Sequence, residues 1–258
     1  MLTAVTYGRT VYKYNIFLLP IFFTKSDGGF FMKKQKNDFF SAKNLTILAV
    51  LVALVVVLQL FGSFIKIGTT PISLVLVPII LGGMLLGVWV GLGLGLLFGF
   101  MVIMSALAGY DVFTLALLQI NPAMTVILCL LKGGLAGFVS ALLFKVIKTK
   151  NKYVAVFVSA IIAPIVNTGI FVAGGFIIVD TISEVFGTLG VDLTGISPVY
   201  IIFVLCVGVN FFIELAVDIV CAPAIYTVER VVEKQILNKY SSKNNKEKEE
   251  VVNNDNLS

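Results

Sequence analysis

Three polar residues recur at four-residue intervals inside a long apolar segment near the C-terminus: Asn210, Glu214 and Asp218. A spacing of four residues keeps side chains on one face of an α-helix, with a drift of only about 40° per step. Lys132 and Asn167 interrupt two earlier apolar segments in the same way. Ionisable side chains at membrane depth are costly, so they are the first candidates for a functional site.

Counted from the outer ends of their segments, Lys132, Asn167 and Asn210 have similar depths, and Glu214 lies one turn deeper. In a structural interpretation, Lys132 neutralises Glu214 or Asp218, and the asparagines form hydrogen bonds between helices. In a functional interpretation, these residues line a pocket open to the outside, which suits a small polar ligand with a carboxylate. The two are compatible, because a carboxylate can hold Lys132 in place until a ligand arrives.

The composition places these polar residues in a membrane protein. The chain is 59% apolar and 13% charged, with 23 glycines, whereas soluble proteins are about a quarter charged. Several apolar stretches exceed the roughly 20 residues that cross a hydrocarbon core. The absence of histidine excludes a histidine-ligated metal site, and the three cysteines have no paired spacing. We therefore predict an all-α integral membrane protein.

Breaks in the apolar pattern predict six transmembrane helices. Residues 72–108 carry no charge. As one helix they would measure about 55 Å against a core of about 30 Å. They must fold back, with the turn at Gly87 beside Trp89. Asn121 and Pro122 divide the next stretch; residues 109–121 then form a loop on or in the membrane, and Asn121 joins the candidate binding residues. The predicted spans are 44–64, 72–86, 88–108, 122–146, 153–179 and 198–228.

The segments outside the spans carry most of the charge. Residues 1–43 form the N-terminal segment, which is basic from Met32 onward. Gly28-Gly29 could be a translated ribosome-binding site, so we hypothesise that the start is mis-called and that the protein begins at Met32 rather than with residues 1–31. Residues 44–228 form the membrane domain, and residues 229–258 a charged tail, disordered beyond Tyr240. Lysines gather on the side of both termini, so the positive-inside rule predicts cytoplasmic termini in the cell membrane.

Small residues at four-residue spacing mark two helix faces. Gly91, Gly95 and Gly99 form one on the third span, and Ala49 and Ala53 form another on the first. Such faces let a neighbouring helix approach closely. One interpretation is helix packing within the protein. The other, which we predict, is a docking surface for a separate membrane protein.

Taken together, these features resemble the substrate-binding S component of energy-coupling factor (ECF) transporters. The resemblance covers about residues 39–233, and the patterns that carry it are Ala49-xxx-Ala53, Pro78…Gly87-xxx-Gly91-xxx-Gly95 and Ala163-Pro164-Ile165-Val166-Asn167-Thr168. It implies a vitamin-binding subunit without a cofactor, which partners a transmembrane coupling protein and two cytoplasmic ATPases that use ATP.

The same resemblance divides the chain by role. In the family, small-residue faces of the first three spans meet the coupling protein, and the later spans with the outer loops bind substrate. Val57 departs from the alanine pattern of the first span. The pattern is closest to the branch of pantothenate and folate binders, and Lys132 favours an anionic ligand, so pantothenate is the first candidate.

Other functional classes have less support. No phosphate-binding loop and no catalytic Ser/His/Asp or Cys/His set occurs in the sequence, so we predict no enzyme, and no nucleic-acid partner. One alternative is a stand-alone secondary transporter of a small organic anion, which would commonly show two related halves. The other is a structural membrane protein whose buried polar groups only hold helices together.

Overall fold

The computed structural model describes residues 42–64, 66–67, 70–71 and 74–255. The proposed mis-called start at residues 1–31 lies outside them. Six helices build the membrane bundle: α1 (Ala42–Phe64), α2 (Leu76–Leu86), α3 (Val88–Leu107), α5 (Pro122–Ile147), α6 (Lys152–Ile177) and α9 (Gly208–Asp255). The shorter elements are β1 (Lys66–Ile67), β2 (Thr70–Pro71), α4 (Val112–Ile120), α7 (Val179–Thr188), α8 (Pro198–Tyr200) and the π-helical segment η2 (Ile201–Val207).

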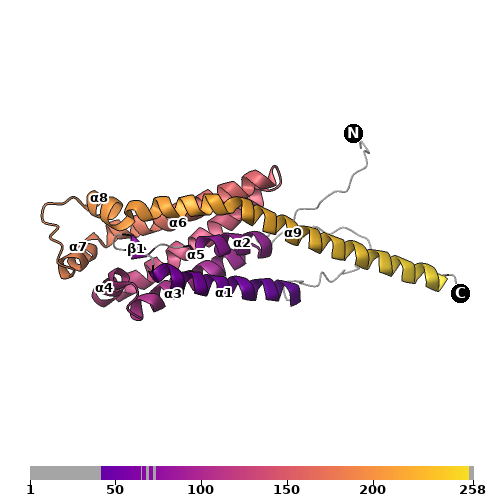
Figure 1. The fold of residues 1–258 in the computed structure, drawn as a ribbon, viewed down its shortest axis with the longest axis horizontal. Coiled ribbons are helices and arrows are strands. Elements are labelled where there is room, and N and C mark those ends of the chain that lie inside the picture. Colours follow the sequence, from indigo (N-terminus) through magenta and orange to yellow (C-terminus); the bar gives the residue numbers. More distant parts are fainter. Residues whose placement is uncertain (1–41, 65, 68–69, 72–73, 256–258) are drawn as a thin grey trace, which may run out of the picture. The chain divides into compact units, whose positions relative to one another are not determined.

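Five of the described helical segments are long and apolar enough to cross a membrane, and α2 is a shorter apolar helix. The last of the five is the continuous segment Pro198–Gln235, which contains α8, η2 and the first part of α9. This is an all-helical membrane protein with the predicted six segments. Figure 1 shows the start of α1 and the end of α9 at one end of the bundle, and α4, α7 and α8 at the other.

The predicted hairpin between the second and third spans is confirmed. Helix α2 ends at Leu86, α3 begins at Val88, and Gly87 between them has φ 105° and ψ 170°. Residues with a Cβ rarely adopt a φ of this sign, so glycine fits this turn. Trp89 beside it is one of the most exposed large side chains of the bundle, as a residue at a membrane interface would be.

Two segments that we expected to be loops contain helices. Residues 109–121 include α4, because the Asp111 carboxylate accepts a hydrogen bond from the Thr114 N–H (3.0 Å) and so caps its first turn. The region 180–197 begins with α7, whose Ile182, Val185 and Phe186 are buried on one face. In both segments, packing against a neighbouring element stabilises a helix that is short by itself.

The tail also differs from the expectation. Helix α9 continues to Asp255, so the structure has helix where we expected disorder beyond Tyr240. The segment is rich in lysine and glutamate, which are good helix formers, and it extends a helix that is already nucleated within the bundle.

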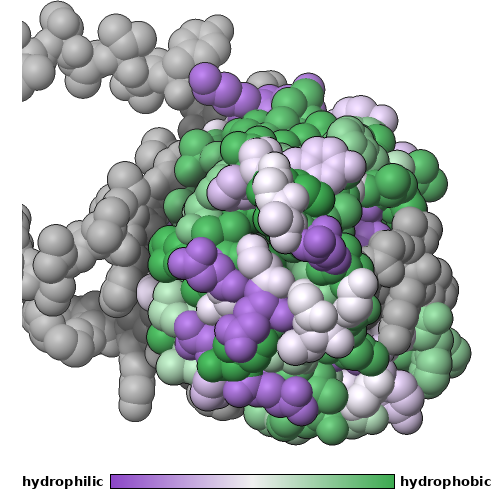
Figure 2. All heavy atoms as spheres, turned by 90° about the vertical axis from the view of Figure 1, so that its left-hand side faces the viewer, coloured by the Kyte–Doolittle hydropathy of each residue, from purple (hydrophilic) through white to green (hydrophobic). Residues whose placement is uncertain are grey.

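The buried apolar residues form two separate clusters. The larger one fills the bundle and includes Val55, Ile79, Phe98, Phe144 and Ile225. The smaller one joins α4, α7 and η2 at one end of the bundle, through Phe113, Leu117, Ile178, Ile182, Val185, Phe186, Ile201 and Cys206. We call α4, α7 and η2 the cap. Figure 2 views this end and shows hydrophilic and intermediate residues gathered on a largely hydrophobic molecule.

Candidate functional site

Asn210, Glu214 and Asp218 share the inward face of α9. Their exposed fractions are 8%, 6% and 2%, whereas the intervening Phe212 and Val220 are 66% and 77% exposed. The prediction that the three polar residues lie on one helix face is confirmed. Their face is the one that packs into the bundle.

A cluster of charges fixes α9 against α6. The ammonium of Lys152, the first residue of α6, forms ion pairs with Glu229 and Glu233 of α9. Asn167 is fifteen residues beyond Lys152 (167 − 152), and Glu214 and Asp218 are each fifteen residues before the two glutamates (229 − 214, 233 − 218). Because α6 and α9 run in opposite directions and both rise about 1.5 Å per residue, Asn167 lies level with Glu214 and Asp218.

A second contact fixes α5 against α6. The Ser159 hydroxyl donates a hydrogen bond to the carbonyl oxygen of Ser140 (2.9 Å), and both serines are buried. Asn167 is eight residues beyond Ser159, and Lys132 is eight residues before Ser140. The two helices are antiparallel, so Lys132 lies at the level of Asn167.

The resulting polar layer has contributions from three helices: Lys132 from α5, Asn167 from α6, and Glu214 with Asp218 from α9. Asn210 lies one turn nearer the cap. The similar depth that we predicted for Lys132 and Asn167 agrees with this register. The layer differs from the prediction for α9, because Asn167 is level with Glu214 and Asp218 rather than with Asn210.

Lys132 is half-buried, and its ammonium lies over the ring of Phe171, with Nζ 5.7 Å from the ring centroid. A cation over an aromatic face gains electrostatic attraction without an anion, more so when it is desolvated. Phe171 also packs against the cluster of the cap. One ring therefore contacts both the lysine of the polar layer and the cap above it.

Two buried oxygens of the layer have no hydrogen-bond donor among the described residues. They are Oδ1 of Asn167 and Oδ2 of Asp218, and the two residues are 6% and 2% exposed. A buried polar atom without a partner costs about 1–3 kcal/mol. Native proteins keep few of them, and an incompletely satisfied buried group is often functional.

Asn121 caps the N-terminus of α5. It is the N-cap of α5, where its side-chain oxygen accepts a hydrogen bond from the Met124 N–H (3.4 Å), and its carbonyl accepts one from the Thr125 hydroxyl (2.7 Å). Its position is at the cap end of the bundle, away from the level of Lys132. A role for Asn121 in ligand binding stays a prediction.

The glycine face of α3 corrects one prediction. Gly91, Gly95 and Gly99 are buried against α5. A Cβ on Gly91 would lie 2.6 Å from the carbonyl oxygen of Gly137, and one on Gly95 would lie 2.7 Å from the carbonyl carbon of Gly133. The two backbones touch, so α5 of the same chain occupies the surface that we assigned to a partner.

The alanine face of α1 is exposed, unlike the glycine face of α3. Ala49 and Ala53 are exposed, as is Val57 one turn further, whereas Leu51 and Val55 are buried on the opposite side. Helix α1 is also the least buried of the described membrane-spanning helices. Its small-residue face is therefore accessible to a partner or to lipid, and its role as a docking surface stays a prediction.

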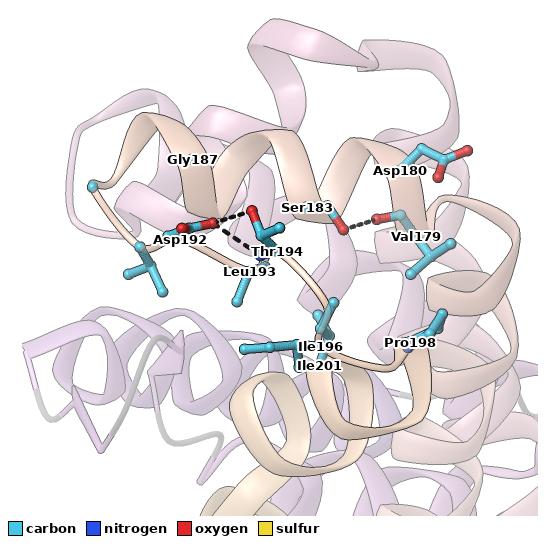
Figure 3. A pocket seen from close by; sticks show the side chains of 12 residues that line it. Val179, Asp180, Ser183, Gly187, Asp192, Leu193, Thr194, Ile196, Pro198 and Ile201 are labelled. Atoms are coloured by element: carbon cyan, nitrogen blue, oxygen red, sulfur yellow. Dashed lines mark hydrogen bonds between the residues drawn. The ribbon is translucent and has the colours of Figure 1, made fainter.

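A cavity of about 620 Å³ lies in the cap region, between α7, the loop that follows it and the start of the last span. Its polar lining includes Asp180, Ser183, Asp192 and Thr194 (Figure 3). The Asp192 carboxylate accepts hydrogen bonds from the Thr194 hydroxyl (2.5 Å) and N–H (2.9 Å), which hold the pKa of Asp192 below its usual value. The charged side chains that line the cavity are both acidic, so it does not attract anions.

Comparison with protein families identifies the chain. Residues 43–226 match the model of the ECF transporter substrate-specific component, which is well over half of the sequence. The chain belongs to this family. No curated protein and no solved structure gave a match. The S component is thus a transport binding protein rather than an enzyme, and it carries no cofactor, because partner ATPases hydrolyse the ATP.

Sequence reasoning missed two features of this S component. The helix that packs against the glycine face of α3 could have been predicted, because Gly133 and Gly137 in the fourth span have the same four-residue spacing. The cavity had a weaker signal: Asp192 and Thr194 lie between Gly190 and Gly195, a composition typical of a structured turn. Neither spacing nor composition indicated that α7 would fold over this loop to enclose a space.

Proposed function

We propose that this S component binds a small water-soluble vitamin from outside the cell and supplies it to an ATP-driven ECF transporter. The observation that carries the proposal is the polar layer of Lys132, Asn167, Glu214 and Asp218 inside a chain of this family. Charged and polar side chains buried inside a membrane are expensive, and by default they indicate a functional site. The cap end, with its cavity, faces outward in this proposal, and both termini lie in the cytoplasm.

We further propose an anionic cargo, with pantothenate as the first candidate. Lys132 carries the argument, since its ammonium is held by an aromatic ring and can exchange this contact for a carboxylate. The unpartnered Asn167 oxygen offers an acceptor for a hydroxyl or amide N–H of the same ligand. The vitamin then enters from the cap end of the bundle, and its carboxylate comes to rest at Lys132.

The partners in this proposal are a transmembrane coupling protein and two cytoplasmic ATPases. The docking surface is the exposed face of α1 with Ala49 and Ala53, because the glycines of α3 are already in contact with α5. Small side chains allow a helix of the coupling protein to approach closely. The change Ala53→Leu would then abolish uptake and leave vitamin binding unchanged. Loss of both activities together would contradict a docking role for this face.

A panel of vitamins tests the cargo. The purified chain in detergent is heated with each vitamin in turn, and a ligand that binds the folded state raises the apparent Tm by mass action. We expect pantothenate to stabilise the chain, and cationic vitamins to have no effect. A shift with a cationic vitamin would contradict the anionic cargo and would move the site to the acidic cavity.

Uptake into vesicles tests the transport mode. An S component binds its vitamin alone but needs the coupling protein and the ATPases for uptake. The chain reconstituted alone should therefore bind the stabilising vitamin without accumulating it. Accumulation by the chain alone, driven by an ion gradient, would identify a secondary transporter instead.

A further inference from the structure

Asp218 of α9 is a carboxyl group buried in the bundle without a counter-charge. It is 2% exposed, and its Oδ2 accepts no hydrogen bond from a described residue. It forms no ion pair with a described residue either. An ionised carboxylate in such surroundings is very costly, and a buried acid normally becomes neutral by taking up a proton.

The titratable groups around this part of α9 do not neutralise Asp218. Glu214 lies one turn away on the same face, where a like charge opposes a second negative charge. Lys132 of α5 supplies a cation at this level, but its ammonium lies over the ring of Phe171, one turn of α6 nearer the cap than Asn167. Helix α2, which also packs against α9, has no ionisable residue. Further titratable groups on α9, α6 and η2 are the thiols of Cys206 and Cys221 and, at the end of α6 away from the cap, Lys152, Tyr153, Tyr226 and Glu229.

Asn167 of α6 is a buried amide whose oxygen also lacks a partner. The residue is 6% exposed, and its Oδ1 accepts no hydrogen bond from the described residues. In the register that the ion pairs of Lys152 set, Asn167 lies level with Glu214 and Asp218. Two unsatisfied acceptors thus occur at one level of neighbouring helices.

The rotation of the two helices turns these side chains toward each other. Lys152 and Tyr153 contact α9, the lysine at Glu229 and the tyrosine at the ring of another tyrosine, with centroids 5.4 Å apart. At about 100° per residue, Asn167 points between Lys152 and Tyr153, about 60° from the first and about 40° from the second. Asp218 is eleven residues before Glu229 (229 − 218) and points within about 20° of it. Both side chains therefore point into the α6–α9 contact.

We infer that Asp218 is a proton-binding site: it is protonated at neutral pH, and its hydroxyl donates a hydrogen bond to Oδ1 of Asn167. One proton then satisfies both buried oxygens, because a protonated carboxyl is a donor and an amide oxygen is an acceptor. A metal cation would need more ligands, since Mg²⁺ and Ca²⁺ take about six or more oxygens. Among the described residues, no group of three or more His, Cys, Asp or Glu side chains could hold a metal ion.

The proton also sets the charge of the polar layer. With Asp218 neutral, Lys132 and Glu214 balance each other, whereas an ionised Asp218 would leave one excess negative charge beside an anionic ligand. The Asn167 oxygen has two lone pairs, so it can accept from Asp218 and from a ligand together. This consequence for the ligand rests on the proposed function. The proton site itself does not, and it is tested without a vitamin.

Infrared spectroscopy of the full chain in detergent tests the protonation directly. With carbon-13 in the aspartate carboxyls, the wild type at neutral pH should show the labelled C=O band of a protonated carboxyl. The band should be lost in Asp218→Asn and kept in the control Asp180→Asn, whose carboxyl is exposed. In Asn167→Val, which removes the acceptor, it should move to higher frequency.

The wild-type spectrum can overturn the site by itself, if it contains no labelled protonated band. A band that remains in Asp218→Asn would overturn it as well. A band that does not move in Asn167→Val would overturn the hydrogen bond between the two helices.

Thermal unfolding in detergent gives a second measurement. Asparagine has the shape of a protonated aspartate, and its NH₂ can donate to Asn167 in the same way. Asp218→Asn should therefore unfold within about 3 °C of the wild type at neutral pH. In the unfolded chain Asp218 ionises in water, so unfolding releases its proton, and the wild-type Tm should fall from neutral to alkaline pH more steeply than that of Asp218→Asn.

The same measurement separates a proton from a metal cation. Replacement of Na⁺ by choline at constant ionic strength should leave the wild-type Tm unchanged. A Tm that depends on Na⁺ in the wild type and not in Asp218→Asn would overturn the proton site in favour of sodium. Equal pH dependence of the two chains, or a much larger loss of Tm in Asp218→Asn at neutral pH, would show that Asp218 acts as an ionised carboxylate.

Discussion

The α3–α5 contact and the α6–α9 contact are built from opposite chemistry. Between α3 and α5, glycines bring two backbones into contact, and no side chain with a charge takes part in the glycine contacts. Between α6 and α9, a lysine and two glutamates set the register, and buried amides and carboxylates follow at the next levels. The first contact fixes the distance between helices. The second contact leaves polar groups with unused hydrogen-bonding capacity, and a ligand can form hydrogen bonds with such groups.

The comparison also changes the meaning of the glycine pattern. A four-residue glycine spacing predicts a close helix contact, but it does not say whether the second helix belongs to the same chain. Here α5 supplies Gly133 and Gly137 at the matching levels. Ala49 and Ala53 are small residues that stay exposed, so the docking surface that we propose lies on their face of α1.

The largest expected effect comes from breaking the α3–α5 contact. Gly95→Leu forces a side chain into the backbone of Gly133, and the overpacking should cost more than about 3 kcal/mol and prevent folding. The amount of chain recovered from the membrane, and its elution as a single species, measure this. Gly93→Leu is the control, because Gly93 is exposed and has open space around its Cβ position. A folded Gly95→Leu protein that binds its vitamin and fails in uptake would restore the docking interpretation.

The α6–α9 contact can be broken at Lys152. Lys152→Ala leaves the buried Glu229 without its cation, which should cost about 1–3 kcal/mol of the free energy of unfolding in detergent. The control is Lys150→Ala, which removes an exposed lysine from the preceding turn. Glu229→Gln in the Lys152→Ala background should recover most of the loss. Equal stability of the two lysine variants would contradict the register that we derive from this ion pair.

A smaller effect is expected at the break in the last span. Gly208→Ala meets no atom within 4 Å, so its cost comes from the backbone conformation alone, about 1 kcal/mol or somewhat more. Gly93→Ala also meets no atom, and it lies in a regular helix, where alanine is favoured by about 1 kcal/mol. The two substitutions should shift the Tm in opposite directions. A stabilising Gly208→Ala would contradict the backbone conformation at this break.

The smallest effect concerns the cavity of the cap. Thr194→Val removes the hydroxyl that donates to Asp192, so the pKa of Asp192 should rise toward its usual value. The depressed pKa of the wild-type carboxyl contributes stability above its ordinary pKa, and this contribution is lost as the pH falls through the lowered value. Carbon NMR titration of labelled aspartate measures the shift. An unchanged pKa in the variant would show that the Thr194 hydroxyl does not act on Asp192.

The sequence predicts the spans because lipid imposes length and apolarity, and the structure agrees on the six segments and on the turn at Gly87. The α9 stripe of Asn210, Glu214 and Asp218 was equally predictable, since helical periodicity alone decides it. Helix α4 and helix α7 were missed because their stability comes from packing in the cap cluster rather than from their own sequences.

The polar layer was predictable only in part. Its members stand out as polar residues in apolar segments, but their common level depends on the ion pair of Lys152 and the hydrogen bond of Ser159. The contact of Lys132 with Phe171 joins two helices through side chains 39 residues apart in the sequence (171 − 132), and no local pattern indicates it. No local sequence pattern indicates that the cap core is separate from the bundle core either.

The most direct test of the account is the affinity of the purified chain for pantothenate, with and without Lys132. Isothermal titration in detergent should show binding to the wild-type chain, and Lys132→Ala should weaken it by about 100-fold, or about 2.7 kcal/mol, in keeping with the loss of a charge-assisted bond. Lys145→Ala, at the far end of α5, should bind as the wild type does. If Lys132→Ala binds unchanged, or is lost from the membrane and recovered by Glu214→Ala, the lysine is a structural ion-pair partner and the account of the site is wrong.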